Sequence, residues 1–145
     1  MKVQTSIELP FSAEKLWNLA GGYDLLPLIS SATAMSRLED GGRVRVLVNR
    51  DGSILWERLL AFDEAARTLS YLITDAKGFL GAYGPGYRGR VTVEAIGPSS
   101  AIFHYAADFE PAPGVSEDQA RAAVLAFADD CAGGMRRVLS LPSFS

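Results

Sequence analysis

The stretch SEDQARAAVLAFADDCAGGMRRVL, residues 116–139, is the one long helical pattern in this chain. Ser116 and Gln119 form a capping box, in which each side chain satisfies a free backbone amide of the first turn. Apolar residues recur at steps of three and four and so share one face: Ala120, Ala123, Val124, Phe127, Cys131, Met135 and Val138. We therefore predict a long amphipathic helix from Ser116 to Leu139, over which the rest of the chain closes as a curved sheet.

Two adjacent glycines, Gly133 and Gly134, interrupt this pattern. Each glycine costs a helix about 1 kcal/mol relative to alanine. They predict either a helix that breaks early or a place where a bulky neighbour or a ligand needs room, and the pattern does not decide between the two.

The bulk composition limits the classes of function. At 145 residues we expect one domain, residues 1–145, large enough to bury a substantial core. A net charge of -3 lacks the basic footprint of a nucleic-acid-binding protein. No apolar run approaches the roughly 18 residues that span a bilayer, and the first residues lack a signal peptide's apolar segment. A single cysteine excludes an internal disulfide, so we expect a cytoplasmic protein without membrane or nucleic-acid partners.

Short strands account for most of the chain before the helix. Residues 3–9 alternate between apolar and polar side chains, which is typical of a half-buried strand. Two short helices follow, the first over residues 13–20 after Ser12 and the second capped by Asp24. Further strands are predicted over these ranges: 31–38, 43–48, 55–59, 69–73, 87–96 and 101–109.

The pair Asp51-Gly52 is typical of a two-residue hairpin turn, because both residues tolerate positive φ. Such a turn sets Val46 opposite Glu57 and places both on a face shared by four other aliphatic residues: Val44, Val48, Leu55 and Leu59. We therefore predict that Glu57 points inward, although a buried carboxylate is costly unless it is paired. The alternatives are a slipped register that exposes Glu57 or a salt bridge with a neighbouring strand.

Tyr71 is a candidate partner for that carboxylate. A three-residue loop before its strand places Tyr71 opposite Leu59 and diagonal to Glu57. The alternative is a core tyrosine whose hydroxyl reaches solvent.

Three other features suggest chemistry that their context argues against. The run GPGYRG at 84–89 matches the dinucleotide pattern GxGxxG, but it leads into a strand and not a helix. His104 falls on the charged outer face of its strand, and no second histidine exists to complete a metal site. Cys131 lies on the inward helix face without a base nearby, so we interpret it as a small buried apolar residue. We expect no metal and no cofactor.

The order of elements resembles the helix-grip fold of the START/Bet v 1-like superfamily (SRPBCC), which includes polyketide cyclases and lipid-transfer proteins. The middle of the chain is similar to the superfamily pattern "ERL…D…I…NY" through these residues: Glu57, Arg58, Leu59, Asp63, Ile73 and Tyr83. Ala82 stands where that pattern has asparagine. The resemblance implies an α+β fold with a curved seven-stranded antiparallel sheet around the C-terminal helix, and a ligand cavity that Glu57 and Tyr83 face.

Two functions from different classes fit these residues, and the first is a binding module. It holds a small hydrophobic or aromatic molecule, such as a lipid, a polyketide or a quinone, between sheet and helix. Glu57 and Tyr83 orient the polar end of that ligand. The expected walls are Leu26, Ile29, Val46, Leu59, Tyr71, Phe103, Tyr105, Phe127 and Cys131.

The second is an enzyme of the cyclase/aromatase or dehydratase kind. Glu57 abstracts a proton alpha to a carbonyl, and Tyr71, Tyr83 or Tyr105 donates to the enolate oxygen. Burial disfavours the charged form of a carboxyl group, which suits a general base. A third hypothesis is a small domain that pairs with a second copy, as a homodimer, or with another protein.

Overall fold

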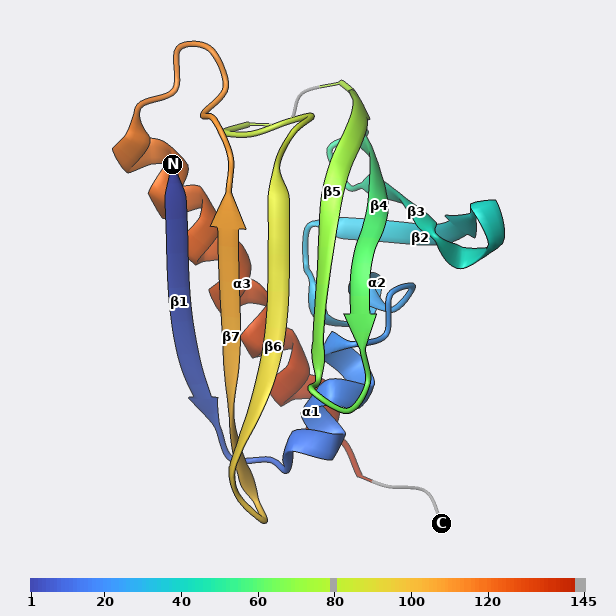
Figure 1. Ribbon diagram of the computed structural model, residues 1–145, viewed down its shortest axis with the longest axis vertical. Helices are drawn as coiled ribbons and strands as arrows, with labels where there is room; N and C mark the ends of the chain where they lie inside the picture. The colour runs from blue at the N-terminus through green and yellow to red at the C-terminus, as the bar shows by residue number, and fades with distance from the viewer. Residues whose placement is uncertain (79–80, 143–145) are drawn as a thin grey trace.

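Seven strands and three α-helices form the part of the chain that the computed structural model describes, residues 1–78 and 81–142 (Figure 1). The first half contains β1 (Lys2–Leu9), α1 (Ala13–Ala20), α2 (Leu26–Ile29), β2 (Thr33–Glu39), the single-turn η1 (Asp40–Gly42) and β3 (Val44–Asn49). The second half contains β4 (Ile54–Asp63), β5 (Thr68–Lys77), β6 (Arg88–Gly97), β7 (Ser100–Asp108) and α3 (Glu117–Leu139). This is the order of elements that the sequence predicts.

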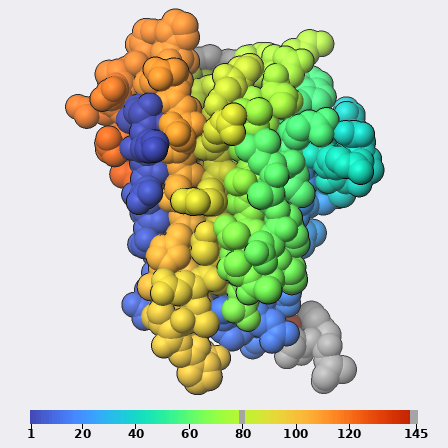
Figure 2. All heavy atoms as spheres, viewed as in Figure 1, coloured from blue at the N-terminus to red at the C-terminus, as the bar shows by residue number. Residues whose placement is uncertain are grey.

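All seven strands form one antiparallel sheet in the order β1-β7-β6-β5-β4-β3-β2. The first strand thus pairs with the last, and β2 and β3 turn crosswise to the other strands (Figure 1). The helix α3 runs behind the sheet, and in the same view with all atoms drawn the strands cover most of it (Figure 2). The predicted α+β arrangement, a curved seven-stranded sheet around a C-terminal helix, is confirmed. No helix within residues 1–78 and 81–142 is long and apolar enough to cross a membrane.

The predicted cap and apolar face of α3 are both present. Ser116 Oγ accepts from the Gln119 amide at 3.1 Å, and the Gln119 side chain accepts from the Ser116 amide at 2.9 Å. The inward face is buried along its whole length and includes Ala120, Val124, Ala128, Cys131 and Met135. Burial of this face against the sheet and against α2 holds the helix in place.

The helix α3 continues through Gly133 and Gly134 without a break. A Cβ at Gly134 would overlap the backbone carbonyl of Ile29 in α2, whereas a Cβ at Gly133 would meet nothing. Of the two interpretations that the sequence allows, the early break is wrong, and the room at Gly134 serves the close approach of α2.

The predicted register of the β3–β4 hairpin is wrong by one residue. Its loop contains three residues, 50–52, because the Asn49 amide donates to the Ser53 carbonyl at 2.9 Å and Gly52 adopts a φ of 88°. A three-residue loop of this kind is a turn followed by one left-handed residue. Glu57 consequently lies opposite Arg45, and Val46 lies opposite Trp56.

The second short helix also differs from its prediction. Its N-cap is Leu25, without a side-chain hydrogen bond, and Asp24 instead accepts a hydrogen bond from Ser36 of β2 at 2.7 Å. The cap of α1 is as predicted, since Ser12 accepts from the Lys15 amide at 3.2 Å.

Candidate functional site

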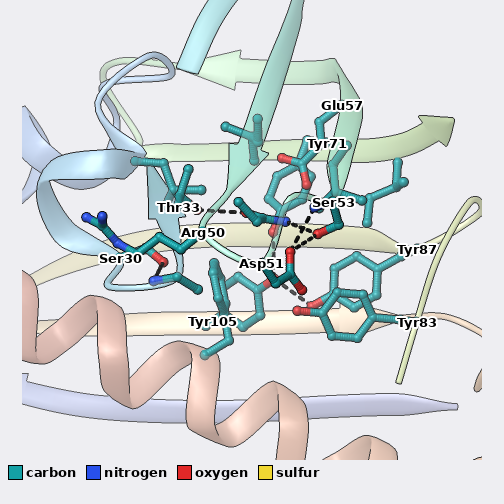
Figure 3. A pocket seen from close by; sticks show the side chains of 17 residues that line it. Ser30, Thr33, Arg50, Asp51, Ser53, Glu57, Tyr71, Tyr83, Tyr87 and Tyr105 are labelled. Atoms are coloured by element: carbon teal, nitrogen blue, oxygen red, sulfur yellow. Dashed lines mark hydrogen bonds between the residues drawn. The ribbon is translucent and has the colours of Figure 1, made fainter. Parts of the chain in front are cut away.

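A cavity of about 360 Å³ lies between the β3–β4 hairpin, the inner face of the sheet and the helices α2 and α3 (Figure 3). Its aliphatic wall is formed by Leu26, Leu47, Leu55 and Ile73. Its inner end is lined by three buried polar side chains: Glu57, Tyr71 and Tyr105. The exposed hairpin residues Arg50 and Asp51 line the outer end and mark the mouth.

The mouth is held by hydrogen bonds between the hairpin tip and the segment after α2. The Arg50 amide donates to the Ala32 carbonyl and its Nε to the Ser31 carbonyl, both at 2.9 Å. Asp51 Oδ1 accepts from the Ser53 hydroxyl at 2.6 Å and from the Ser53 amide at 2.9 Å, and these bonds lower the pKa of Asp51. Hydrogen bonds to the segment after α2 and within the hairpin therefore fix the hairpin tip.

Three tyrosine hydroxyls meet inside the cavity, and we refer to Tyr71, Tyr87 and Tyr105 as the tyrosine triad. Tyr105 Oη lies 2.6 Å from Tyr71 Oη and 2.6 Å from Tyr87 Oη. Burial raises the pKa of all three hydroxyls above the usual range, so each keeps its proton near neutral pH. The triad has three protons and two internal bonds, because each bond uses one proton. One phenolic proton is left to donate to a further acceptor.

Gly89 allows the triad to form. It lies directly opposite Tyr71 in the β5–β6 pair, and a Cβ at this position would overlap the Tyr71 ring. Without that Cβ the ring lies across β6 and its hydroxyl reaches Tyr105 on β7. The last glycine of GPGYRG thus makes room for an aromatic ring, and the segment continues into strand β6 as predicted.

Glu57 is buried as predicted, with 4% of its surface exposed, and its partner is Arg45. Arg45 Nε and Nη2 both lie 2.7 Å from Glu57 Oε1. Burial by itself lowers the pKa of Arg45, but the adjacent Glu57 carboxylate raises it above its ordinary value. The two side chains form a buried ion pair. The salt bridge with a neighbouring strand, an alternative that the sequence left open, is the one present.

Arg45 is also held from its other side. Its Nη1 donates to the Tyr23 carbonyl at 3.2 Å, and its Cζ lies 4.4 Å and 4.8 Å from the ring centres of Tyr23 and Tyr71. The Tyr23 hydroxyl donates to the Glu57 carbonyl at 2.7 Å, and burial raises the pKa of Tyr23 so that this donor stays protonated. The ion pair is therefore enclosed by aromatic rings and hydrogen bonds.

Six of the eleven predicted site residues line the cavity: Leu26, Glu57, Tyr71, Tyr83, Tyr105 and Phe127. Val46 is buried but does not line it. The Tyr83 ring stacks on Tyr87 at 4.4 Å, and burial raises the pKa of Tyr83 to about 12. Three others, Ile29, Phe103 and Cys131, line an adjoining void of about 30 Å³ that shares Leu26, Tyr71, Tyr105 and Phe127 with the cavity. Leu59 packs on the core beside neither space.

The structure also places three residues whose chemistry the sequence analysis considered. Tyr71 lies opposite Leu59 as predicted, but its hydroxyl bonds Tyr105 and not Glu57. Cys131 is buried, and burial raises the pKa of its thiol to about 12, which keeps it an unreactive thiol. His104 bonds Ser6 and Glu94 on the outer face, and no cluster of metal-ligating side chains occurs within the described residues.

Sequence reasoning missed Arg45 and Tyr87. Tyr87 continues the inward alternation of Val91 and Val93 towards the start of β6, so that alternation was a usable signal. The predicted two-residue hairpin loop places Val46 opposite Glu57 and turns Arg45 to the other face of the sheet. A three-residue loop would have placed it beside Glu57.

A curved antiparallel sheet that grips a C-terminal helix and encloses a cavity is the architecture of the START/Bet v 1-like proteins. The profile of one family of this class, polyketide cyclase/dehydrase and lipid transport, matches residues 1–140. The chain therefore belongs to that family. No curated protein matches the sequence.

Solved structures agree on the fold. The protein XoxI from Bacillus cereus is 28% identical with a TM-score of 0.86, and the match covers 99% of both chains. A START superfamily protein from Mycobacterium smegmatis is 15% identical with a TM-score of 0.76, over 97% of this chain and 99% of the other. The di-domain aromatase/cyclase BexL from the BE-7585A biosynthetic pathway is 15% identical with a TM-score of 0.76, over 97% of this chain and 47% of BexL.

Proposed function

We propose that this protein binds one small hydrophobic or aromatic molecule, of the lipid, polyketide or quinone kind, in the cavity between sheet and helix. The observation that carries the proposal is the unused phenolic proton of the tyrosine triad, which lies in a space walled by aliphatic side chains. The volume of about 360 Å³ falls within the range of roughly 300–1,000 Å³ typical of small-molecule sites.

The proposed division of labour follows from the lining. Burial of apolar ligand surface against Leu47, Leu55 and Ile73 supplies most of the affinity, at about 25 cal/mol per Å² removed from water. The triad orients the ligand by donating its third proton to a carbonyl or hydroxyl oxygen. A hydrogen bond of this kind contributes about 1 kcal/mol net, which is enough to fix an orientation but not to drive binding alone.

The first test asks whether the protein retains a ligand. Solvent extracts of the purified protein, examined by mass spectrometry beside a native spectrum of the intact protein, should contain one lipid-like or aromatic compound. If the protein is purified empty, acetonaphthone, an aromatic ketone, should raise its melting temperature. A bare protein that also ignores acetonaphthone and related bicyclic probes would contradict the proposal.

Two tyrosine variants test the role of the triad. Tyr105→Phe removes the central hydroxyl, which holds the other two in place, and should weaken acetonaphthone binding about fivefold, the equivalent of one hydrogen bond of about 1 kcal/mol. Tyr23→Phe is the matched control, because the Tyr23 hydroxyl bonds the Glu57 carbonyl and does not line the cavity. Equal losses in the two variants would show that the triad does not orient the ligand.

A second candidate function is catalysis of the cyclase/aromatase or dehydratase kind. The observation that favours it is that Glu57 and the neutral triad line the same cavity, as a base and an oxyanion donor would. In this structure the Glu57 carboxylate is paired with Arg45 through Oε1. With a poly-β-ketone substrate, Glu57→Gln should abolish turnover and spare affinity if the protein is an enzyme. Loss of affinity without any turnover in the parent protein supports binding.

A further inference from the structure

We infer that the ligand of this cavity is an uncharged molecule that offers a hydroxyl or N–H donor to Glu57, and that the site discriminates against carboxylates. The inference rests on the proposed binding function and names its ligand class. It follows from which polar atoms the cavity presents and which it withholds.

Glu57 presents one carboxylate oxygen to the cavity. Arg45 Nε donates to Oε1, Nη2 forms an ion pair with the same oxygen, and no described residue donates to Oε2. Every fully buried side-chain oxygen or nitrogen within the described residues has a hydrogen-bond partner, so Oε2 must be accessible. Because Glu57 lines the cavity, that access is from the cavity. A carboxylate oxygen only accepts, so its natural partner is a donor on the ligand.

The guanidinium of Arg45 does not line the main cavity. Arg45 is 6% exposed and lines only the adjoining void of about 30 Å³. Its Nε donates to Glu57 and its Nη2 forms an ion pair with the same oxygen, its Nη1 donates to the Tyr23 carbonyl, and its Cζ lies against two tyrosine rings. A ligand therefore meets the anion of the pair first, with the cation behind it.

The remainder of the lining does not favour an anion. The triad hydroxyls are neutral donors because burial raises their pKa. At the mouth, Arg50 is adjacent to Asp51, so each sign of charge occurs once. A carboxylate at the inner end would lose its water next to Glu57 and meet no cation there, because Arg50 lies at the mouth beside Asp51. A neutral hydroxyl loses less hydration free energy on entry than a carboxylate does, and it gains a charge-assisted hydrogen bond to Glu57.

Three naphthalene probes of the same size test this inference on the unmodified protein. At about pH 7 naphthol is a neutral donor, methoxynaphthalene is neutral without a donor, and naphthoate is an anion. Calorimetry should rank them in that order, with naphthol at least about tenfold tighter than naphthoate. Naphthoate binding as tightly as naphthol overturns the inference and leaves the binding function intact. Failure of all three probes to bind counts against the binding function itself.

A variant then assigns the preference to Glu57. Glu57→Gln should lower naphthol affinity and raise naphthoate affinity, because the charge of Arg45 is no longer neutralised. Glu94→Gln is the matched control, since Glu94 is exposed on the outer face and bonds His104. An unchanged ranking in folded Glu57→Gln overturns the inference. If that variant does not fold, Arg45→Met/Glu57→Gln removes both charges and should abolish the preference.

Discussion

At the scale of single residues, the site depends on one buried ion pair. Glu57 is tolerated beneath the sheet because Arg45 neutralises it, and Arg45 is tolerated because Glu57, the Tyr23 carbonyl and two aromatic rings surround it. A buried pair of this kind adds little stability compared with an apolar pair, but each partner is costly alone. The role that we propose for the pair is to position a carboxylate oxygen at the cavity.

We predict that removing one member of the Arg45–Glu57 pair lowers the free energy of unfolding more than removing both. Arg45→Met should lower the free energy of unfolding by about 3–5 kcal/mol, because it leaves an uncompensated carboxylate in the core. Arg45→Met/Glu57→Gln should be more stable than Arg45→Met, since no buried charge remains. Urea unfolding monitored by circular dichroism measures both. A double variant less stable than Arg45→Met would show that the unpaired carboxylate is not what destabilises the single variant.

The inward direction of Glu57 was predictable, and its partner was not. The alternation of Leu55, Glu57 and Leu59 along one strand is local and determines which side chains share a face. The identity of the residue opposite depends on loop length, and Asp51-Gly52 fits both a two-residue turn and the end of a three-residue loop. A difference of one loop residue exchanged Val46 for Arg45 beside Glu57.

At the scale of elements, the contact between α2 and α3 depends on a single missing Cβ. Gly134 is buried against the Ile29 carbonyl, and its neighbour Gly133 is exposed. Helix propensity treats the two glycines alike, whereas the tertiary structure does not. They therefore form a matched pair for separating propensity from packing.

We predict opposite effects of alanine at these two positions. Gly133→Ala should stabilise the protein by up to about 1 kcal/mol through helix propensity. Gly134→Ala should destabilise it by about 1–3 kcal/mol, because α2 must move away from the helix. Thermal and urea unfolding of the two variants give the comparison. If Gly134→Ala were as stable as Gly133→Ala, α2 would not pack on α3 in the way described.

At the scale of the whole molecule, the sequence contains enough to predict the fold but not the cavity. Strand alternation, the capping box and the apolar face of the last helix are local patterns, and they predicted the order of elements. The cavity depends on residues distant in the chain, such as Tyr71 of β5 over Gly89 of β6. The packing of the sheet against α3 also determines that Phe103 and Cys131 line the small adjoining void and not the main cavity.

The burial of tyrosines also predicts how the whole molecule responds to alkali. All five tyrosines have a raised pKa, mainly through burial, and the pKa of Tyr83 reaches about 12. In the unfolded chain the pKa of each tyrosine is about 10. A group whose pKa is higher in the folded state contributes stability that is complete below the unfolded value and is lost as pH rises towards the folded value. Stability should therefore decline from about pH 10 upward.

The expected observation is a delayed and steep ionisation. Tyrosinate absorbance should stay low through pH 10 and then rise together with the loss of the circular dichroism signal, because the hydroxyls ionise only when the core opens. Tyr105→Phe removes one buried hydroxyl and should make the decline of stability with pH less steep. A gradual titration centred near pH 10 in a protein that stays folded would show that the tyrosines reach water, and the enclosed triad would then be wrong.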